Sequence, residues 1–338
     1  MDFYKPSIEY RNKAYYIFPS FISKPSKDLM TKGGKFFAVW DEKNGVWSTD
    51  EFDLIRIIDE ELQEYVKELK KLEPYKNETL NIKYMAEHKS RSFKDFLEYV
   101  RMLPDRYKTL NSKIIFQNEE ITKEDYATNK LSYPIAEGDT LAWDTLVSKL
   151  FSSSEKEKIE WAIGAVVTGD SKKIQKFLLF YGDPGTGKST ILDIITDMFD
   201  GYCAEINAKA ITRADDNFGL SCLASDPLIL YQHDCKLSKI DDNSTLNSLV
   251  SHEKVIVNEK FKSQYTVKPQ AFIFLGTNEP VKITDGKSGI IRRLIDVMPT
   301  GETFRSKEYF KLIKEVKFEY GAIAYKCKQL YLEKGKSY

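Results

Sequence analysis

The sequence predicts an α/β fold in which helices flank a central parallel sheet, preceded by a smaller mixed α/β or α+β domain. Three consecutive features predict it. The apolar run at residues 177–181 has the composition of a strand buried on both faces. The glycine-rich segment 182–189 follows directly, and apolar residues then recur with helical spacing from Ile191 to Phe199. A strand, a glycine-rich loop and a helix in this order are a known supersecondary unit of parallel sheets.

Composition places the chain among globular proteins. Of its 338 residues, 42% are hydrophobic and 30% charged, which is enough to bury a large core, and the length suggests about two domains. The 51 basic and 51 acidic residues cancel, so a bound polyanion would need a local patch. The four cysteines form no CxxC pair. We therefore expect reduced thiols, no membrane partner and a cytoplasmic location.

The first 140 residues are expected to form a separate accessory domain. Residues 35–40 have a strand pattern, and Asn44-Gly45 between apolar segments predicts a turn. The aromatic residues of this region have two interpretations, because they can fill a core or form a platform for stacked bases. They are Phe36, Phe37, Trp40 and Trp47.

Two helices are expected after this hairpin. Ser48-Thr49-Asp50-Glu51 matches a capping box, and apolar residues then recur every three or four positions from Phe52 to Leu72. A second helix is expected from Ser92 to Leu103, because Pro104 follows it. From Leu110 to Tyr133 the pattern becomes short and β-like.

We place the boundary between the first domain and the rest of the chain near residues 135–150, because the polar stretch 136–139 has the composition of a linker. Helical patterns follow at 143–151 and 159–167. We therefore expect an accessory domain at 1–140, a nucleotide-binding domain at 141–301, and a basic helical C-terminal segment at 302–338.

Residues 182–189 fit the pattern G-x-x-x-x-G-K-[ST] at every fixed position. Glycines allow backbone N–H groups to face a phosphate, and the N-terminus of the following helix adds a partial positive charge. Lys188 can reach the β- and γ-phosphates, and the Ser189 hydroxyl can ligate Mg²⁺. The pattern predicts a site for ATP and Mg²⁺ formed by Gly182, Asp183, Pro184, Gly185, Thr186, Gly187, Lys188, Ser189 and Thr190.

A second buried strand is expected at residues 227–232, and it ends at His233-Asp234. A carboxylate at the carboxyl end of a strand beside a phosphate-binding loop can hold Mg²⁺ or the attacking water. Asp234 is therefore the candidate for both the catalytic and the metal-binding role. The alternative is an aspartate that begins a turn, and His233 is better explained as an ordinary surface or packed residue.

A third apolar strand, residues 271–276, leads to Asn278. An uncharged amide there can hydrogen-bond a γ-phosphate or orient water. Arg292 and Arg293 follow, and an arginine finger is worth about 10³–10⁵ in rate. An arginine pair is also a common surface feature, but its position after the other motifs favours a catalytic role.

This order of motifs resembles the superfamily 3 helicases of viruses and plasmids, a branch of the AAA+ ATPases. Within them the sequence is most similar to the poxvirus- and phage-type primase–helicase group. The resemblance covers roughly residues 35–300 and includes Leu110-Asn111 and Trp161-Ala162-Ile163-Gly164. It is specific over the ATPase motifs and looser before residue 100. The resemblance implies that residues 1–140 are an accessory domain that serves oligomerisation, similar to the region that precedes the ATPase in this group.

The resemblance implies an AAA+ ATPase fold and a replicative DNA helicase of phage or mobile-element type. In such a protein ATP is hydrolysed at the subunit interfaces of a ring, a homo-oligomer that is usually a hexamer, and the ring moves 3′ to 5′ along single-stranded or forked DNA. The resemblance also implies that Asn278 is the polar sensor and that Arg292 or Arg293 reaches the neighbouring subunit's ATP. A primase or polymerase of the same replicon is a further expected partner, and the location would be the host cytoplasm if a phage encodes the chain.

One position departs from the family pattern. These ATPases usually carry a glutamate or an acidic pair where this chain has a lone Asp234 between His233 and Cys235. Because an aspartate is one methylene shorter, the pattern leaves open whether Asp234 alone serves as the base.

The family's DNA-contacting hairpin precedes the third strand. Residues 255–268 alternate here as a two-stranded hairpin would, with Lys260, Phe261 and Lys262 at the expected tip. Lysines there can grip phosphates while an aromatic ring contacts sugar or base. The alternative is a solvated hairpin with incidental lysines.

Three other functions fit the same motifs. An initiator or loader would use nucleotide only as an assembly switch. A small-molecule kinase would need an acceptor pocket and lid arginines, and it would work without a ring. A protein remodeller would grip polypeptide with the Phe261 hairpin. Priming is not predicted, because no suitable acidic cluster precedes residue 100.

Overall fold

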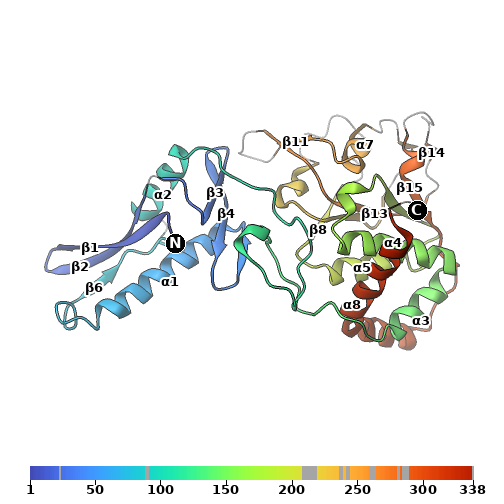
Figure 1. The fold of residues 1–338 in the computed structure, drawn as a ribbon, viewed down its shortest axis with the longest axis horizontal. Coiled ribbons are helices and arrows are strands. Elements are labelled where there is room, and N and C mark those ends of the chain that lie inside the picture. Colours follow the sequence, from blue (N-terminus) through green and yellow to red (C-terminus); the bar gives the residue numbers. More distant parts are fainter. Residues whose placement is uncertain are drawn as a thin grey trace. The chain divides into compact units, whose positions relative to one another are not determined.

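The computed structural model describes residues 1–22, 24–87, 91–207, 219–235, 239–240, 244–258, 264–279, 282–283 and 289–336 (Figure 1). Its contacts divide the chain into two compact units. Unit 1 comprises Met1–Thr109 and Thr122–Thr128, and unit 2 comprises Leu110–Ile121 and Asn129–Tyr338. The division therefore differs from the expected boundary near residue 140. No helix within the described ranges is long and apolar enough to cross a membrane.

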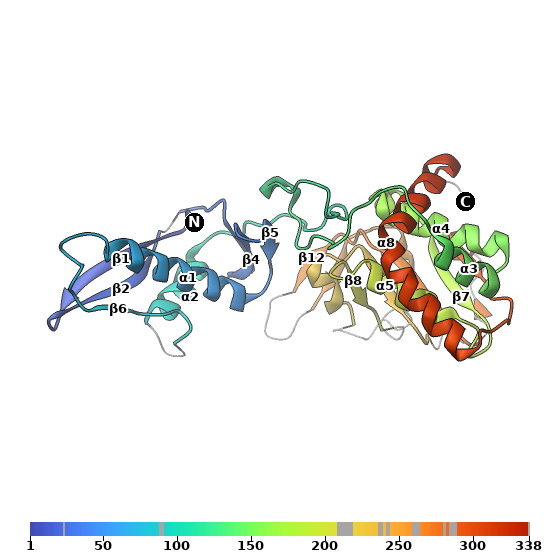
Figure 2. The same ribbon diagram turned by 90° about the horizontal axis from the view of Figure 1, so that it is seen from below.

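In its described residues, unit 1 contains two small sheets and two α-helices (Figure 2). The first sheet has the order β1-β2-β6 and the second the order β3-β4-β5. Helices α1 and α2 pack against β2 and β4, and Leu54, Ile58 and Phe96 lie in the shared core. The elements are β1 (Tyr4–Arg11), β2 (Ala14–Phe21), β3 (Leu29–Lys32), β4 (Lys35–Asp41), β5 (Val46–Ser48), α1 (Glu51–Leu69), β6 (Leu80–Ile82), α2 (Arg91–Met102) and the short 3₁₀ helix η1 (Lys123–Asp125).

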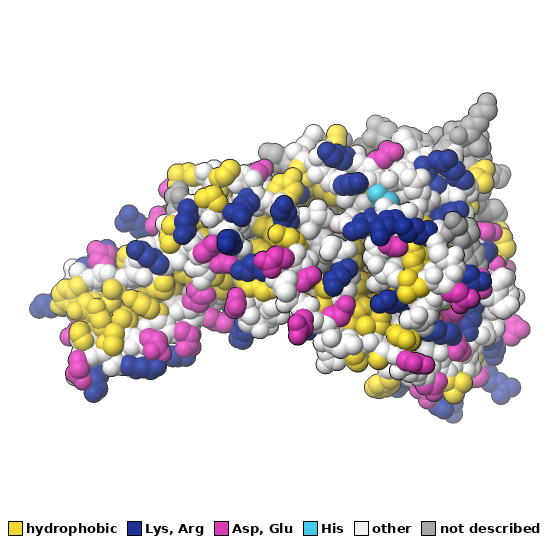
Figure 3. All heavy atoms as spheres, viewed as in Figure 1, with side chains coloured by type: hydrophobic (Ala, Val, Ile, Leu, Met, Phe, Trp, Pro, Cys, Tyr) yellow, Lys and Arg dark blue, Asp and Glu magenta, His cyan; other side chains and the backbone are white. Residues whose placement is uncertain are grey.

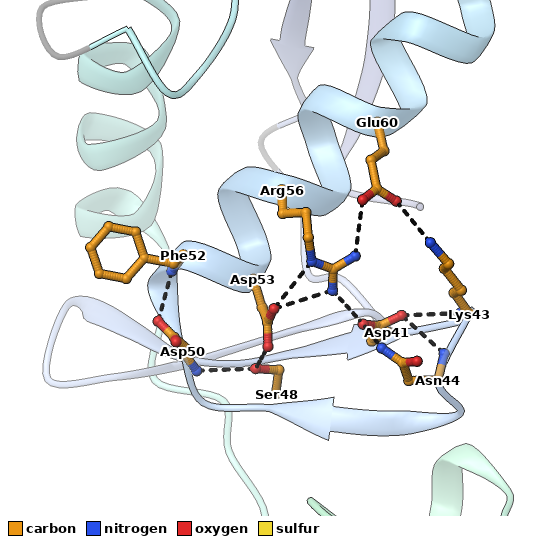
Figure 4. A network of polar contacts seen from close by, with 9 residues as sticks. All are labelled: Asp41, Lys43, Asn44, Ser48, Asp50, Phe52, Asp53, Arg56 and Glu60. Carbon is orange, nitrogen blue, oxygen red and sulfur yellow. Dashed lines mark hydrogen bonds and ion pairs between the residues drawn. The ribbon is translucent and has the colours of Figure 1, made fainter.

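The start of α1 corrects the expected cap. Asp50, not Ser48, is the N-cap, and its carboxylate accepts a hydrogen bond from the Phe52 backbone N–H at 2.8 Å (Figure 4). Ser48 instead donates to Asp53 Oδ2 at 2.7 Å. The strand over 35–41, the turn at Asn44-Gly45 and both helices are confirmed. Phe52 lies on the solvent side with 79% of its surface exposed, so the expected apolar stripe begins at Leu54.

Segment 110–133 forms no β-strand, which corrects the β-like interpretation. Its backbone groups find isolated partners instead of a ladder. The Leu110 N–H donates to Asp226 Oδ2, and the Ile115 N–H donates to the Tyr202 hydroxyl. Two backbone hydrogen bonds, from the Gln117 N–H to the Tyr133 carbonyl and from the Leu131 N–H to the Ile115 carbonyl, join the two expected strand segments without forming a ladder.

Unit 2 is built around a five-stranded parallel sheet of order β15-β7-β13-β9-β8 in the described residues. The buried strands alternate between two cores: Leu178 and Phe180 face one, and Phe177 and Leu179 face the other. Both faces are therefore covered, as the apolar run at 177–181 predicted. Helices α3, α4, α5 and α8 contribute to the first core, whereas α7 and the β11–β12 hairpin contribute to the second.

The helices of unit 2 are α3 (Leu141–Leu150), α4 (Ser153–Val167), α5 (Lys188–Met198), α7 (Ser244–Val250) and α8 (Ser306–Lys334), with short 3₁₀ helices η2 (Ser171–Lys173), η3 (Ser221–Ser225) and η4 (Ile291–Arg293). Its strands are β7 (Phe177–Tyr181), β8 (Cys203–Glu205), β9 (Ile229–Gln232), β10 (Lys239–Ile240), β11 (Val255–Val257), β12 (Tyr265–Val267), β13 (Phe272–Thr277), β14 (Lys282–Ile283) and β15 (Leu294–Val297). The two helices expected at 143–151 and 159–167, and the three buried strands, are confirmed.

Helix α8 belongs to unit 2 and is not a separate tail (Figure 2). It packs most closely on α4, where Gly164 is required: a Cβ there would lie 2.1 Å from the Cys327 carbonyl oxygen. Val316, Ile323 and Cys327 are fully buried. The expected basic segment at 302–338 is therefore helical, and one face of it completes the core.

Candidate active site

The glycine-rich loop connects the carboxyl end of β7 to the N-terminus of α5, as the motif requires. Gly185 and Gly187 have φ values of +78° and +96°, which L side chains rarely adopt. A Cβ at Gly187 would also lie 2.7 Å from Leu150 Cδ1. The glycines are thus needed both for the loop's conformation and for its close packing on α3.

Lys188 is 4% exposed at the first turn of α5. Its Nζ donates hydrogen bonds to the carbonyl oxygens of Gly182 and Asp183, both at 2.8 Å. Burial lowers the pKa of the Lys188 ammonium, and the charges of Asp234 and Asp183 oppose this effect. The loop therefore holds a cation at the point where phosphate oxygens would enter.

Asp234 and Asn278 meet beside this loop. Strand β13 lies between β7 and β9 and is parallel to both, so the carboxyl ends of the three strands share one edge of the sheet. Asn278 Nδ2 donates a hydrogen bond to Asp234 Oδ1 at 3.2 Å. The tertiary structure thus brings together two residues that the sequence analysis selected separately.

A cavity of about 400 Å³ lies over the loop. Its walls contain Leu150, Pro184, Gly185, Gly187, Lys188, Ser189, Thr190, Asp234, Asn278, Thr303, Phe304 and Tyr309. A hydroxyl from Ser189 and a carboxylate from Asp234 face the same space, which suits Mg²⁺ held by few protein ligands and by phosphate. The described residues contain no group of three or more His, Cys, Asp or Glu arranged to hold a metal.

Four wall residues carry no signal in the sequence. Thr303, Phe304 and Tyr309 come from the segment beyond the arginine pair, and Leu150 ends α3. The Tyr309 hydroxyl hydrogen-bonds Thr190 Oγ1 at 2.9 Å, and Lys149 Nζ lies 4.2 Å from the centroid of the Phe304 ring. Only the packing of α8 and its leading loop on the core places these groups over α5.

The two arginines have different environments. Arg292 is exposed, whereas Arg293 is 9% exposed and its guanidinium donates to Asn247 Oδ1 and Ser251 Oγ at 3.1 and 2.8 Å. Burial and the neighbouring Arg292 charge lower the pKa of Arg293. Neither arginine lines the cavity.

Both arginines lie at the amino ends of the sheet's strands, whereas the glycine-rich loop lies at the carboxyl ends. They precede β15, whose first residue Leu294 pairs with Phe177 at the start of the parallel strand β7. The loop follows the end of β7 at Tyr181. Lys176 Nζ also donates to the Arg292 carbonyl oxygen at 2.8 Å. The length of a strand, about 3.3 Å per residue, therefore separates the arginines from the cavity of their own chain.

The remaining predicted residues are placed as follows. Asp183 and Thr186 shape the loop, where Thr186 Oγ1 donates to the Asp183 carbonyl at 2.7 Å. His233 Nε2 lies 3.5 Å from Asp193 Oδ1, outside the cavity walls. The expected hairpin is confirmed by antiparallel pairing of β11 with β12. Lys260, Phe261 and Lys262 lie outside the described residues.

Comparison with known proteins identifies the same region. A protein-family model described as "Family of unknown function (DUF5906)" matches residues 180–293, from the end of β7 to Arg293. No curated protein matches the sequence.

Three solved structures of the NrS-1 C-terminal region are similar to the chain. An "A form apo structure" is 15% identical with a TM-score of 0.50 and covers 86% of this chain and 64% of that one. An apo structure is 16% identical with a TM-score of 0.45, covering 62% of this chain and 56% of that one. A further A form is 16% identical with a TM-score of 0.43, covering 61% and 53%.

The chain thus spans between about half and two thirds of the length of these structures. Their low identity limits the likeness to fold. The similarity at a TM-score of 0.50 agrees with a mixed α/β chain built on a five-stranded parallel sheet.

Proposed function

We propose that this chain is an ATP-hydrolysing DNA helicase of the superfamily 3, AAA+ type that acts in phage-type replication. One observation carries the proposal: the glycine-rich loop, Asp234 and Asn278 line a single cavity at the carboxyl edge of a parallel sheet. That edge is where ligands bind in open α/β folds.

Different residues of the cavity have different roles in the proposed transfer of a phosphoryl group from ATP to water. The backbone N–H groups of the loop and the Lys188 ammonium bind the β- and γ-phosphates, and Lys188 exchanges its two carbonyl partners for phosphate oxygens. Ser189 and Asp234 hold Mg²⁺, which neutralises charge on those phosphates. Asp234 also orients the attacking water, and Asn278 fixes its carboxylate and reaches the γ-phosphate.

The position of the arginines supports hydrolysis between subunits. Arg292 is exposed at the amino ends of the strands, and the cavity lies at their carboxyl ends. Arg292 can therefore complete an ATP site only on a neighbouring chain. Arg292 is therefore the proposed finger, whereas the Arg293 guanidinium is held by Asn247 and Ser251. A kinase would need a lid arginine over its own phosphates, and the described cavity wall contains none.

The test is ATP hydrolysis by the full chain with Mg²⁺, measured without DNA, with single-stranded DNA and with a fork. Lys188→Ala removes the phosphate-binding ammonium, and Lys172→Ala removes an exposed lysine outside the cavity as a matched control. We expect DNA to stimulate hydrolysis in the wild type and in the control, and the fork to be unwound.

Three other outcomes would decide against the proposal. Hydrolysis of ATP at an equal rate with and without DNA would contradict the helicase function and support an ATPase that does not act on DNA. Nucleotide-dependent assembly without turnover would identify an assembly switch, the loader alternative. Full-rate hydrolysis by a strict monomer would exclude a finger acting between subunits.

A further inference from the structure

Unit 1 contains a second cavity, of about 270 Å³, that the proposed ATPase does not use. Its walls are formed by Ser26, Lys27, Leu29, Met30, Trp47, Arg106, Tyr107, Lys108, Lys123, Glu124 and Tyr126. The segment at 106 is held firmly, because Arg106 and Thr31 exchange two backbone hydrogen bonds of 2.9 Å each. The cavity is therefore built on paired backbone rather than on a loose loop.

Positive charge dominates this cavity. Lys27, Arg106, Lys108 and Lys123 line it, against one acidic residue, Glu124. Lys123 already pairs with Asp28. Lys27, Arg106 and Lys108 are exposed and form no ion pair with any carboxylate in the described part of unit 1. In a chain whose charges balance overall, these three cations are a local site for an anion.

Aromatic rings lie beside the cations. Tyr107 is 43% exposed, and its ring is packed edge-on against Phe37 while Lys32 Nζ lies 4.5 Å from its centroid. Tyr126 stacks on Trp47 with ring centroids 6.0 Å apart. Part of each tyrosine surface is open to solvent while neighbours hold the ring in place.

The backbone at Tyr126 is strained. Its φ is +51°, in the left-handed region that bulky side chains rarely adopt. Such conformations cost free energy and concentrate at functional sites. Here the conformation ends η1 and keeps the Tyr126 ring against Trp47, in the cavity wall.

We propose that this cavity binds single-stranded nucleic acid. Arg106, Lys108 and Lys27 contact consecutive phosphates, and bases stack on Tyr107 and Tyr126. Cations beside ordered aromatic faces are the combination used to bind single strands without sequence preference. A duplex keeps its base faces covered by stacking, and an acidic peptide would use the cations without needing the rings. The site is separate from the nucleotide cavity and is expected to hold a strand without ATP.

The experiment measures binding of a fluorescent oligo-dT by the full chain without nucleotide, as anisotropy over a range of salt. Arg106→Ala/Lys108→Ala removes two phosphate contacts, and Tyr107→Ala removes a stacking face. Lys94→Ala/Arg101→Ala removes the same two residue types from exposed positions of α2 that do not line the cavity. Photocrosslinking of a bromodeoxyuridine strand, followed by peptide mapping, locates the contact directly.

We expect Arg106→Ala/Lys108→Ala to weaken binding at least about tenfold and to lower the slope of log K against log salt by about 1.4, with the control unchanged. Tyr107→Ala should weaken binding about tenfold with an unchanged salt slope. Crosslinks should map to Tyr107 or Tyr126. All variants should keep the wild-type melting temperature and basal ATP hydrolysis.

Two results would overturn the proposal. One is crosslinking confined to residues outside unit 1 with unchanged affinity in the cavity variants. The other is tight binding of an acidic peptide at this cavity without competition by oligo-dT, which would make it a protein-docking surface. Loss of ATP hydrolysis in Lys188→Ala with unchanged oligo-dT binding would leave this site standing, so its failure is distinguishable from failure of the proposed ATPase.

Discussion

Asn278 Nδ2 donates a hydrogen bond to Asp234 Oδ1 over 3.2 Å, although the two residues follow different strands, β13 and β9. The bond fixes the orientation of the single carboxylate that faces the Lys188 loop. A lone aspartate is shorter than the glutamate of the resembled family, so in the proposed ATPase the Asn278 amide would hold this shorter carboxylate in place.

Asn278→Ala should therefore lower kcat for ATP about a hundredfold with little change in the KM for ATP, because an oriented group is lost while phosphate binding is kept. Steady-state kinetics with saturating DNA measure both constants. Glu279→Ala, an exposed neighbour in the same loop, is the control and should retain full activity. An equal loss in the two variants would assign the effect to the loop and not to Asp234.

Lys188→Met should abolish stabilisation by ATP. Ligand at about a hundred times its Kd stabilises a folded protein by about 2.7 kcal/mol, which raises the melting temperature of a unit this size by about 5–10 °C. Differential scanning fluorimetry with and without Mg-ATP should show that rise in the wild type and none in Lys188→Met. A rise in both would mean that ATP binds without this ammonium.

The lowered pKa of Lys188 also predicts how the stability difference between the wild type and Lys188→Met depends on pH. Between the lowered pKa and its ordinary value of 10.5, the unfolded state binds more protons than the folded state, so the stability from this group rises with pH. Without ATP, the wild type should therefore gain stability relative to Lys188→Met as pH rises through that window. If the difference in the free energy of unfolding between the two proteins stayed constant with pH, burial would not lower the pKa of Lys188.

Phe304→Ala should raise the KM for ATP severalfold, because the ring forms one wall of the cavity beside Tyr309 and Lys149. A stacked ring is worth about 1–3 kcal/mol per base in comparable contacts. Phe318→Ala is the matched control, since Phe318 on α8 is 92% exposed and outside the cavity. Unchanged affinity of Phe304→Ala for ATP would show that the base of the nucleotide does not stack on the Phe304 ring.

The two arginines should behave differently. Arg293→Ala should destabilise unit 2 by about 2–3 kcal/mol, because it leaves Asn247 and Ser251 without the buried guanidinium. Arg292→Ala should leave the melting temperature unchanged and abolish hydrolysis. Thermal unfolding and ATPase assays on each variant distinguish the roles.

Mixing two inactive proteins tests whether Arg292 acts on a neighbour. Lys188→Ala retains the arginine and Arg292→Ala retains the phosphate-binding loop, so mixed rings should recover part of the activity. No recovery at any ratio, although the subunits co-assemble, would contradict a finger that acts between subunits.

Arg56→Ala should destabilise unit 1 by about 1.5–3 kcal/mol at pH 7. Arg56 binds Asp41 at 2.7 Å and also contacts Asp53 and Glu60 (Figure 4). Burial alone would raise the pKa of Asp41, but hydrogen bonds from Arg56 and Asn44 outweigh it and hold the pKa below 3.8. The stability that Asp41 contributes is present above about pH 4 and is lost as pH falls through the lowered pKa.

Urea denaturation at several pH values checks this prediction. The difference between wild type and Arg56→Ala should shrink below pH 4. Lys67→Ala breaks an exposed pair with Glu64 and should cost under about 1 kcal/mol at any pH. A difference that stays constant to low pH would show that packing of the Arg56 side chain, and not its charge, stabilises the unit.

Figure 3 shows Lys and Arg side chains beside hydrophobic ones over the part of unit 1 that holds β3 and β4. From the sequence, Phe36, Phe37, Trp40 and Trp47 of this region are either core residues or a stacking platform. The structure makes Trp40 and Trp47 buried core residues, 8% and 2% exposed. Phe36 and Phe37 are half-buried, and the cavity rings Tyr107 and Tyr126, which no periodic pattern distinguished, are also partly open to solvent.

Local signals in the sequence determined the elements that carry the candidate site. The glycine-rich loop, its flanking strand and helix, and the strands ending near Asp234 and Asn278 each depend on hydrogen bonding and burial over a few residues, which a linear pattern records. The expected strands within 110–133 did not form, because only two backbone hydrogen bonds join residues 115–117 to 131–133 and distant side chains accept from the Leu110 and Ile115 N–H groups.

Only the tertiary structure decided how these elements combine. Placing β13 between β7 and β9 joined Asn278 to Asp234, and packing α8 on α4 brought Phe304 and Tyr309 to the cavity over the glycine-rich loop. The parallel register of β15 with β7 put Arg292 and Arg293 at the far edge, and the packing there buried Arg293 and exposed Arg292. Strand order and helix docking depend on contacts between residues far apart in the chain, so no local pattern specifies them.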